Sequence, residues 1–128
     1  MLWIILGIIF IGYCLIPSYF ARNHSNKVLR KGASNKKWIA LTFDDGPSPE
    51  YTPRVLDILK KYDVPASFFL VGNFAALNPQ LVKRMQAEGH SVGCHSYFHY
   101  HAWLMPPLTS YIDMMRTYKV IKKILGQA

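Results

Sequence analysis

Short apolar runs and longer periodic segments follow one another along most of the chain, and their spacing predicts the elements. Short runs bounded by Gly, Pro or polar residues predict three strands, at residues 38–43, 66–71 and 90–95. Apolar positions that recur with the period of a helix predict three helices, at residues 52–62, 79–88 and 109–125. Gly89 and Gly126 follow two of these helices, where glycine commonly ends a helix.

The order of these elements predicts the fold class. Strands and helices alternate as β-α-β-α-β-α, which is typical of an α/β domain with a parallel sheet and right-handed crossovers. In such folds, ligands bind at the carboxyl ends of the strands. We therefore look for chemistry where the predicted strands end.

The first 21 residues form a different kind of segment. Residues 1–21 contain no charged side chain, and about 20 apolar residues suffice for a helix to cross a bilayer. We expect a single-pass transmembrane anchor here. A cleaved signal peptide is the alternative, but no charged residue precedes the apolar run and no small-residue cleavage site is evident. A buried core helix is a third interpretation, which the absence of a polar face disfavours.

The positive charge of the chain is concentrated next to this segment. The formal net charge is +8, with 15 Lys and Arg against 7 Asp and Glu. Residues 22–37 hold six of these basic residues and no acid, so we interpret them as a basic linker beside membrane lipid head groups. Because the remaining charges nearly balance, we expect no nucleic-acid partner. The linker's charge by itself favours a cytoplasmic position for residues 22–128.

Polar side chains follow two of the predicted strands. Asp44 and Asp45 follow the first strand, and the adjacent carboxylates would repel each other without a cation. His95 and His99 follow the third strand, four residues apart, a spacing at which two imidazoles can bind one ion. One Asp and two His supply three ligands and leave a position open for water, as in catalytic zinc sites. The other carboxylate can then accept a proton from that water.

Each motif also has a plain structural interpretation. An Asp-Asp-Gly-Pro segment is an ordinary turn when taken alone, and two His four residues apart are common; only their joint position favours a site. His101 is a possible extra ligand but lies outside the spacing, so a supporting or solvent-exposed role is expected. We expect His90, before the third strand, to be structural. Cys94 points away from His95 on a strand, and a buried thiol is expected.

These residues resemble a known family. The segments are Thr42–Pro47, Ala66–Gly72 and Glu88–His99, with sequences TFDDGP, ASFFLVG and EGHSVGCHSYFH. Their motifs, order and spacing resemble those of the polysaccharide deacetylases that carry the NodB-homology domain. The resemblance extends over about residues 37–126.

The resemblance implies a metal-dependent hydrolase that removes acetyl groups from cell-wall or surface polysaccharides, with an irregular (β/α) barrel. By resemblance, Asp44 matches the general base, and Asp45, His95 and His99 match the ligands of a divalent ion, usually Zn²⁺. An acetylated polysaccharide lies outside the cell, so the resemblance places the domain on the extracytoplasmic side. For the side of the membrane on which residues 22–128 lie, we follow the resemblance rather than the preference of basic residues for the cytoplasmic side.

The chain departs from the family in two respects. Tyr100 stands where the family often has Pro, and the later motifs of the family, including the one that carries its general acid, do not occur in the 128 residues. We therefore expect residues 38–128 to form the front portion of the domain, a partial barrel that releases little acetate by itself. The alternative function is an inactive, membrane-tethered module that binds a metal or a glycan.

Overall fold

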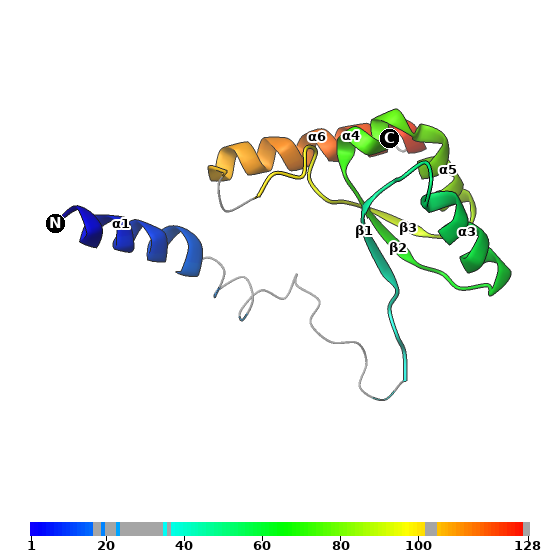
Figure 1. The fold of residues 1–128 in the computed structure, drawn as a ribbon, viewed down its shortest axis with the longest axis horizontal. Helices are drawn as coiled ribbons and strands as arrows, with labels where there is room; N and C mark the ends of the chain where they lie inside the picture. The colour runs from blue at the N-terminus through cyan, green and yellow to red at the C-terminus, as the bar shows by residue number, and fades with distance from the viewer. Residues whose placement is uncertain (17–18, 20–22, 24–34, 36, 102–104, 127–128) are drawn as a thin grey trace. The chain divides into compact units, whose positions relative to one another are not determined.

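The fold was analysed in a computed structural model that describes residues 1–16, 19, 23, 35, 37–101 and 105–126 (Figure 1). Contacts within the chain divide it into two compact units, Met1–Ile39 and Ala40–Ala128. The predicted strands and helices all lie in the second unit, apart from residues 38 and 39 of the first predicted strand. Most of the predicted basic linker, residues 22–37, lies outside the described residues.

The described residues of the first unit include two short helical segments. Helix α1 spans Leu2–Phe10 and continues into a π-helical segment, Ile11–Leu15, labelled η1. Part of the predicted 21-residue span lies outside the described residues, namely residues 17, 18, 20 and 21. Among the helices that the structure describes, none has both the length and the apolar character needed to cross a membrane.

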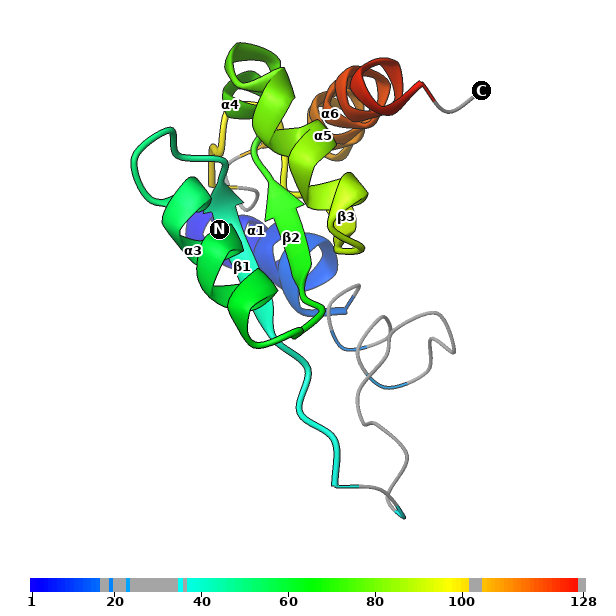
Figure 2. The same ribbon diagram turned by 90° about the vertical axis from the view of Figure 1, so that its right-hand side faces the viewer.

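The second unit is built on a three-stranded parallel sheet (Figure 2). Its strands are β1 (Thr42–Gly46), β2 (Ser67–Leu70) and β3 (Ser91–Cys94), in the spatial order β1-β2-β3. The predicted α/β class and parallel sheet are confirmed. Because the strands are parallel, their carboxyl ends meet at one edge of the sheet, which is where the polar motifs were expected.

Within the described part of this unit, four helices accompany the strands. They are α3 (Thr52–Lys61), α4 (Gly72–Leu77), α5 (Pro79–Ala87) and α6 (Pro107–Leu125). Pro53, Pro79 and Pro107 lie in the first turns of their helices, where the missing N–H group has no helical partner in any case. Gly126 ends α6 with a left-handed φ of +66°, as expected for a glycine cap.

The core lies on one face of the sheet. Phe68 and Leu70 of β2 are buried, whereas Phe69 between them is 37% exposed on the opposite face. Leu56 of α3 and Met85 of α5 are fully buried against the same face. Ile121 of α6 joins this cluster. Helices α3, α5 and α6 therefore pack on the same face of the sheet, as the helices of a (β/α) barrel segment do.

The first strand differs from its prediction. We expected a strand at 38–43, but β1 begins at Thr42 and extends to Gly46. The partner strand explains the difference, because β2 begins at Ser67, which pairs with Thr42. Residues 38–40 precede this pairing, and Trp38 and Ile39 are exposed. The two aspartates consequently belong to the strand itself rather than to a turn after it.

Helix α4 was not predicted. Gly72 begins it directly after β2, and a Cβ atom at this position would lie 2.5 Å from Cδ2 of Tyr97 and 2.6 Å from Oγ1 of Thr117. Only glycine fits there without displacement of these neighbours. This close approach lets α4 pack against α6 and the segment after β3.

Candidate metal centre

Asp45 owes its position to an irregularity in β1. Asp44 pairs with Phe69 and Gly46 pairs with Leu70, so the register leaves Asp45 as an extra residue in β1. Its φ of +67° lies in the left-handed region, which Asp tolerates better than most residues. A bulge of this kind re-aims a side chain relative to a regular strand. The bulge therefore frees the Asp45 side chain from the strict alternation of a regular strand.

The histidines follow the end of β3. The N–H of His95 donates a hydrogen bond of 2.8 Å to the carbonyl of Leu70 on the neighbouring strand, which fixes its backbone. The chain then turns sharply, with positive φ values at Ser96 (+64°) and His99 (+58°). The Ser96 hydroxyl accepts a hydrogen bond of 2.9 Å from the N–H of His99. This turn brings the second imidazole back toward the first.

The three predicted ligands converge on one point. Oδ1 of Asp45 lies 3.1 Å from Nε2 of His95 and 3.0 Å from Nε2 of His99. The two imidazole rings are stacked, with centroids 5.2 Å apart. The donor atoms of all three residues lie within 4.8 Å of one another. The structure thus brings together the three residues that the family resemblance assigned to one ion.

The donor set fits a divalent ion. Zinc is commonly bound by His nitrogen and Asp oxygen at about 2.0–2.1 Å, so tetrahedral ligand atoms lie about 3.3 Å apart. The separations of 3.0 and 3.1 Å from the carboxylate to the imidazoles are close to that spacing. All three side chains are partly exposed, with 37% to 61% of their surface open to solvent. An ion could therefore enter from solvent and keep room for a further ligand.

Helices α4 and α6 support the turn that carries the histidines. The N–H of Tyr97 donates a hydrogen bond of 2.6 Å to Oδ2 of Asp113 in α6. The carbonyls of Ser96 and Tyr97 accept bonds of 2.9 and 3.1 Å from the N–H groups of Gly72 and Asn73 at the start of α4. The turn is therefore tied to two helices that are distant in sequence.

The other residues considered from sequence occupy different places. Asp44 precedes Asp45 in β1 and is exposed, and its side chain forms no hydrogen bond or ion pair with any described residue. His101 is exposed and does not belong to the donor group found among the described residues. Cys94 is half-buried rather than buried, and burial raises the pKa of its thiol.

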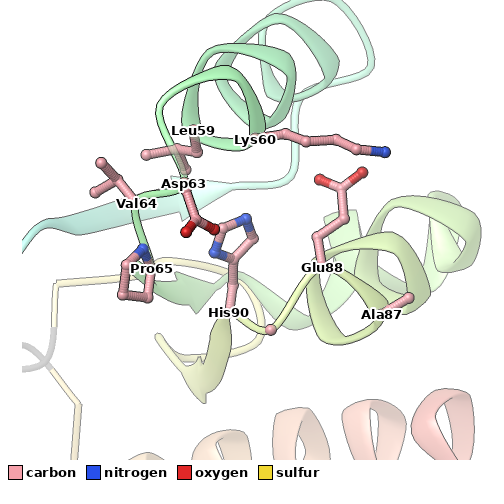
Figure 3. Close-up of a pocket in the computed structure, with 9 residues that line it drawn as sticks. Leu59, Lys60, Asp63, Val64, Pro65, Ala87, Glu88 and His90 are labelled. Atoms are coloured by element: carbon pink, nitrogen blue, oxygen red, sulfur yellow. The ribbon is translucent and has the colours of Figure 1, made fainter.

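His90 lies at the opposite edge of the sheet, away from the carboxyl ends of the strands (Figure 3). Its side chain is buried, and Nδ1 accepts a hydrogen bond of 3.3 Å from the N–H of Ala66. Its ring also packs 5.4 Å from that of Phe68. These contacts agree with the structural role expected from the sequence.

Sequence reasoning missed Asp113, Ser96 and Gly72, the three residues that hold the turn. Asp113 lies within an otherwise apolar and basic helical segment, and its single negative charge was the available signal. Ser96 belongs to the His-Ser-x-x-His motif but was given no role there. Gly72 was counted only as the end of a strand motif. Each depends on a contact between segments that sequence spacing does not describe.

Comparison with known proteins identifies the family to which the chain belongs. The family model described as polysaccharide deacetylase matches residues 31–128. The chain therefore belongs to the polysaccharide deacetylase family. The match includes both aspartates and both histidines of the candidate metal centre.

Individual relatives support the same assignment. A peptidoglycan-N-acetylglucosamine deacetylase of Bacillus cereus is 40% identical over 97 residues, which cover 76% of this chain and 35% of the relative. A chitooligosaccharide deacetylase of Bradyrhizobium is 36% identical over 113 residues, covering 88% of this chain and 49% of the relative. The chain thus spans half or less of the length of these curated relatives.

Solved structures share the fold. A peptidoglycan deacetylase, PdaC from Bacillus subtilis, is 41% identical, with a TM-score of 0.69 over 72% of this chain and 46% of that chain. A family 4 carbohydrate esterase from Bacillus anthracis is 38% identical, with a TM-score of 0.70 over 75% of this chain and 46% of that chain. The three-stranded unit therefore has the fold of part of a polysaccharide deacetylase domain.

Proposed function

We propose that this chain carries the metal-binding and proton-accepting part of a deacetylase site that acts on an acetylated polysaccharide. The observation that carries the proposal is the convergence of Asp45, His95 and His99 at the carboxyl ends of β1 and β3, with Asp44 adjacent. Membership of the family supports it.

We assign a separate task to each side chain. Asp45, His95 and His99 hold a divalent ion, for which we propose Zn²⁺ because two imidazoles and one carboxylate suit it. A bound ion of this kind acts as a Lewis acid and lowers the pKa of a coordinated water. Asp44 is the general base, since its carboxylate is exposed and free to accept the proton of the attacking water.

We propose an N-acetylated glycan as the substrate class. The relatives named above act, by their names, on peptidoglycan N-acetylglucosamine and on chitooligosaccharides. An amide must be hydrolysed in that case, and the leaving amine needs a proton as the bond breaks. We do not assign that general acid to any residue of this chain.

The alternative function is a binding module that holds the ion and the glycan without hydrolysis. The exposed position of the donor group favours it, because an open site positions a substrate poorly. Hydrolysis of an activated ester distinguishes the deacetylase from the binding module. The 4-nitrophenolate leaving group of 4-nitrophenyl acetate departs without protonation, so the ion and Asp44 suffice for its hydrolysis.

The test is the release of 4-nitrophenolate by the purified chain with Zn²⁺ and after chelation. We expect zinc-dependent hydrolysis that Asp44→Asn reduces at least about tenfold, since general bases typically contribute about 10²–10⁴-fold. Zinc affinity should stay unchanged in that variant, because Asp44 is not one of the three ligands.

Two other outcomes would contradict the proposal. Hydrolysis that is equal with zinc and with chelator would exclude the metal centre from the reaction. Binding of zinc and of an N-acetylated oligosaccharide without any zinc-dependent hydrolysis would assign the chain to the binding module.

A further inference from the structure

Three aromatic residues flank the second histidine of the candidate metal centre in the sequence. Tyr97 and Phe98 precede His99, and Tyr100 follows it. The ring centroids of Tyr97 and Phe98 are 4.7 Å apart in an edge-to-face contact, and those of Phe98 and Tyr100 are 5.4 Å apart in a stacked contact. The rings therefore form a connected series from Tyr97 to Tyr100.

Arg116 of α6 fixes one part of this series. Its guanidinium carbon lies 4.0 Å from the ring centroid of Tyr97 and 5.2 Å from that of Phe98. Cation–π contacts of this kind add to the hydrogen bond between Tyr97 and Asp113, which belongs to the same helix. The inner rings are consequently held in place by α6.

Tyr100 differs from the inner rings because it is largely exposed. Its exposed fraction is 63%, against 43% for Phe98 on which it stacks. An aromatic ring that is held by stacking loses little conformational entropy when it binds a ligand, and tyrosine combines an apolar face with a polar hydroxyl. Such a ring can offer a rigid surface to a ligand that also combines an apolar face with polar groups.

A pyranose ring combines an apolar face with polar groups. One or both of its faces present C–H groups, which pack on the electron-rich face of an aromatic ring, and its hydroxyls lie at the rim. Tyr100 follows His99 directly, and Nε2 of His99 lies 3.0 Å from Oδ1 of Asp45. A sugar that packs on Tyr100 would therefore lie beside the metal centre.

We propose that Tyr100 is a positioning residue for the glycan, whose pyranose ring stacks on it beside the metal centre. This inference rests on the proposed function. The family resemblance does not supply it, because the family often has Pro at this position and the aromatic ring is a feature of this chain. Tyr100 takes no part in the chemical step and acts through substrate placement.

The test compares glycan binding by zinc-saturated variants of the full chain. The probe is tetra-N-acetylchitotetraose, and NMR chemical-shift titration gives its dissociation constant. We expect Tyr100→Ala to weaken binding about three- to tenfold, as loss of one aromatic stacking contact would. Tyr100→Phe should retain binding within about twofold, because the stacking face remains. Zinc affinity should be equal in all variants.

Tyr62→Ala is the matched control. Tyr62 is 66% exposed, follows α3 near the opposite edge of the sheet, and also has a cation near its ring, Nζ of Lys61 at 5.4 Å. Its removal should leave glycan binding unchanged. Thermal unfolding of each variant checks that a loss of binding does not come from a loss of folding.

The possible results separate this inference from the proposed function. Equal glycan affinity of the original chain and Tyr100→Ala would overturn the inference and leave the proposed function standing. No glycan binding by the zinc-saturated original chain would overturn both. A dimer of the original chain that Tyr100→Ala dissociates would assign the ring to an interface between copies and would also overturn the inference.

Discussion

Asp45 shows how one backbone conformation shapes the candidate metal centre. In a regular strand, the side chains of Asp44 and Asp45 would point to opposite faces. The bulge at Asp45 and its φ of +67° remove that constraint and direct its carboxylate to both imidazoles. For most residues other than glycine the left-handed conformation costs about 1–2 kcal/mol, and Asp tolerates it better than most. Contacts elsewhere in the fold must offset the free-energy cost of this backbone conformation.

The first prediction at this scale concerns His95. His95→Ala removes one of three donors, so the zinc dissociation constant should rise at least about 100-fold, more than loss of an outer supporting group usually causes. Titration calorimetry measures the change.

His101→Ala is the control for this prediction, because His101 is a nearby histidine outside the donor group found among the described residues. Its substitution should change zinc affinity less than about threefold if the ion depends on the three proposed ligands. An unchanged affinity in His95→Ala would reject the site.

At the scale of elements, the site depends on how α6 holds the segment after β3. The turn of residues 95–99 carries both histidines, and it is bonded to α4 through two backbone hydrogen bonds and to α6 through Asp113. Helix α6 is also part of the core through Ile121. The helix thus links the stability of the core to the placement of the ligands.

The prediction for this scale concerns Asp113. Asp113→Ala removes the acceptor of the Tyr97 N–H group and should weaken zinc binding about 10- to 100-fold, as changes to supporting groups of metal ligands typically do. Asp113→Asn keeps an acceptor oxygen and should restore most of the affinity. Titration calorimetry with zinc provides the measurement.

Asp57→Ala is the matched control. Asp57 is an exposed acid on α3 that pairs with Arg84, and this pair raises the pKa of the guanidinium. Its loss should leave zinc affinity unchanged, because exposed ion pairs contribute little and this one is distant from the turn in the fold. Equal zinc affinity of Asp113→Ala and the original chain would show that α6 does not position the ligands.

At the scale of the whole molecule, the site belongs to one of the two compact units. All three proposed ligands, the proposed general base Asp44 and the supporting residue Asp113 lie in Ala40–Ala128. The core that carries them is formed by the sheet and its helices, with members between Leu56 and Ile121. The second unit therefore contains the contacts that shape the metal centre.

The corresponding prediction concerns residues 1–37. A chain that lacks them should bind zinc with an affinity within about threefold of the full chain, because no described ligand or supporting contact is removed. Circular dichroism should show the same cooperative unfolding of the remaining part. A large loss of zinc affinity, with folding retained, would show that the first unit contributes to the site.

The sequence by itself determined the α/β class, the parallel sheet and three of the four helices that accompany it. Local hydrophobic periodicity and the positions of Gly and Pro carry that information, since both act over a few residues. The sequence motifs also indicated one Asp and two His as a candidate group of metal ligands. His95 and His99 could be found because strand ends are predictable and parallel strands bring their carboxyl ends to one edge, whereas the choice of Asp45 over Asp44 came from the family resemblance.

Only the tertiary structure decided how these residues meet. The start of β1 at Thr42 depends on where β2 offers a partner, and the bulge at Asp45 depends on the register between the two strands. The roles of Gly72 and Asp113 depend on the approach of α4 and α6 to the turn after β3. These features arise from contacts between segments far apart in the chain, which local sequence patterns do not encode.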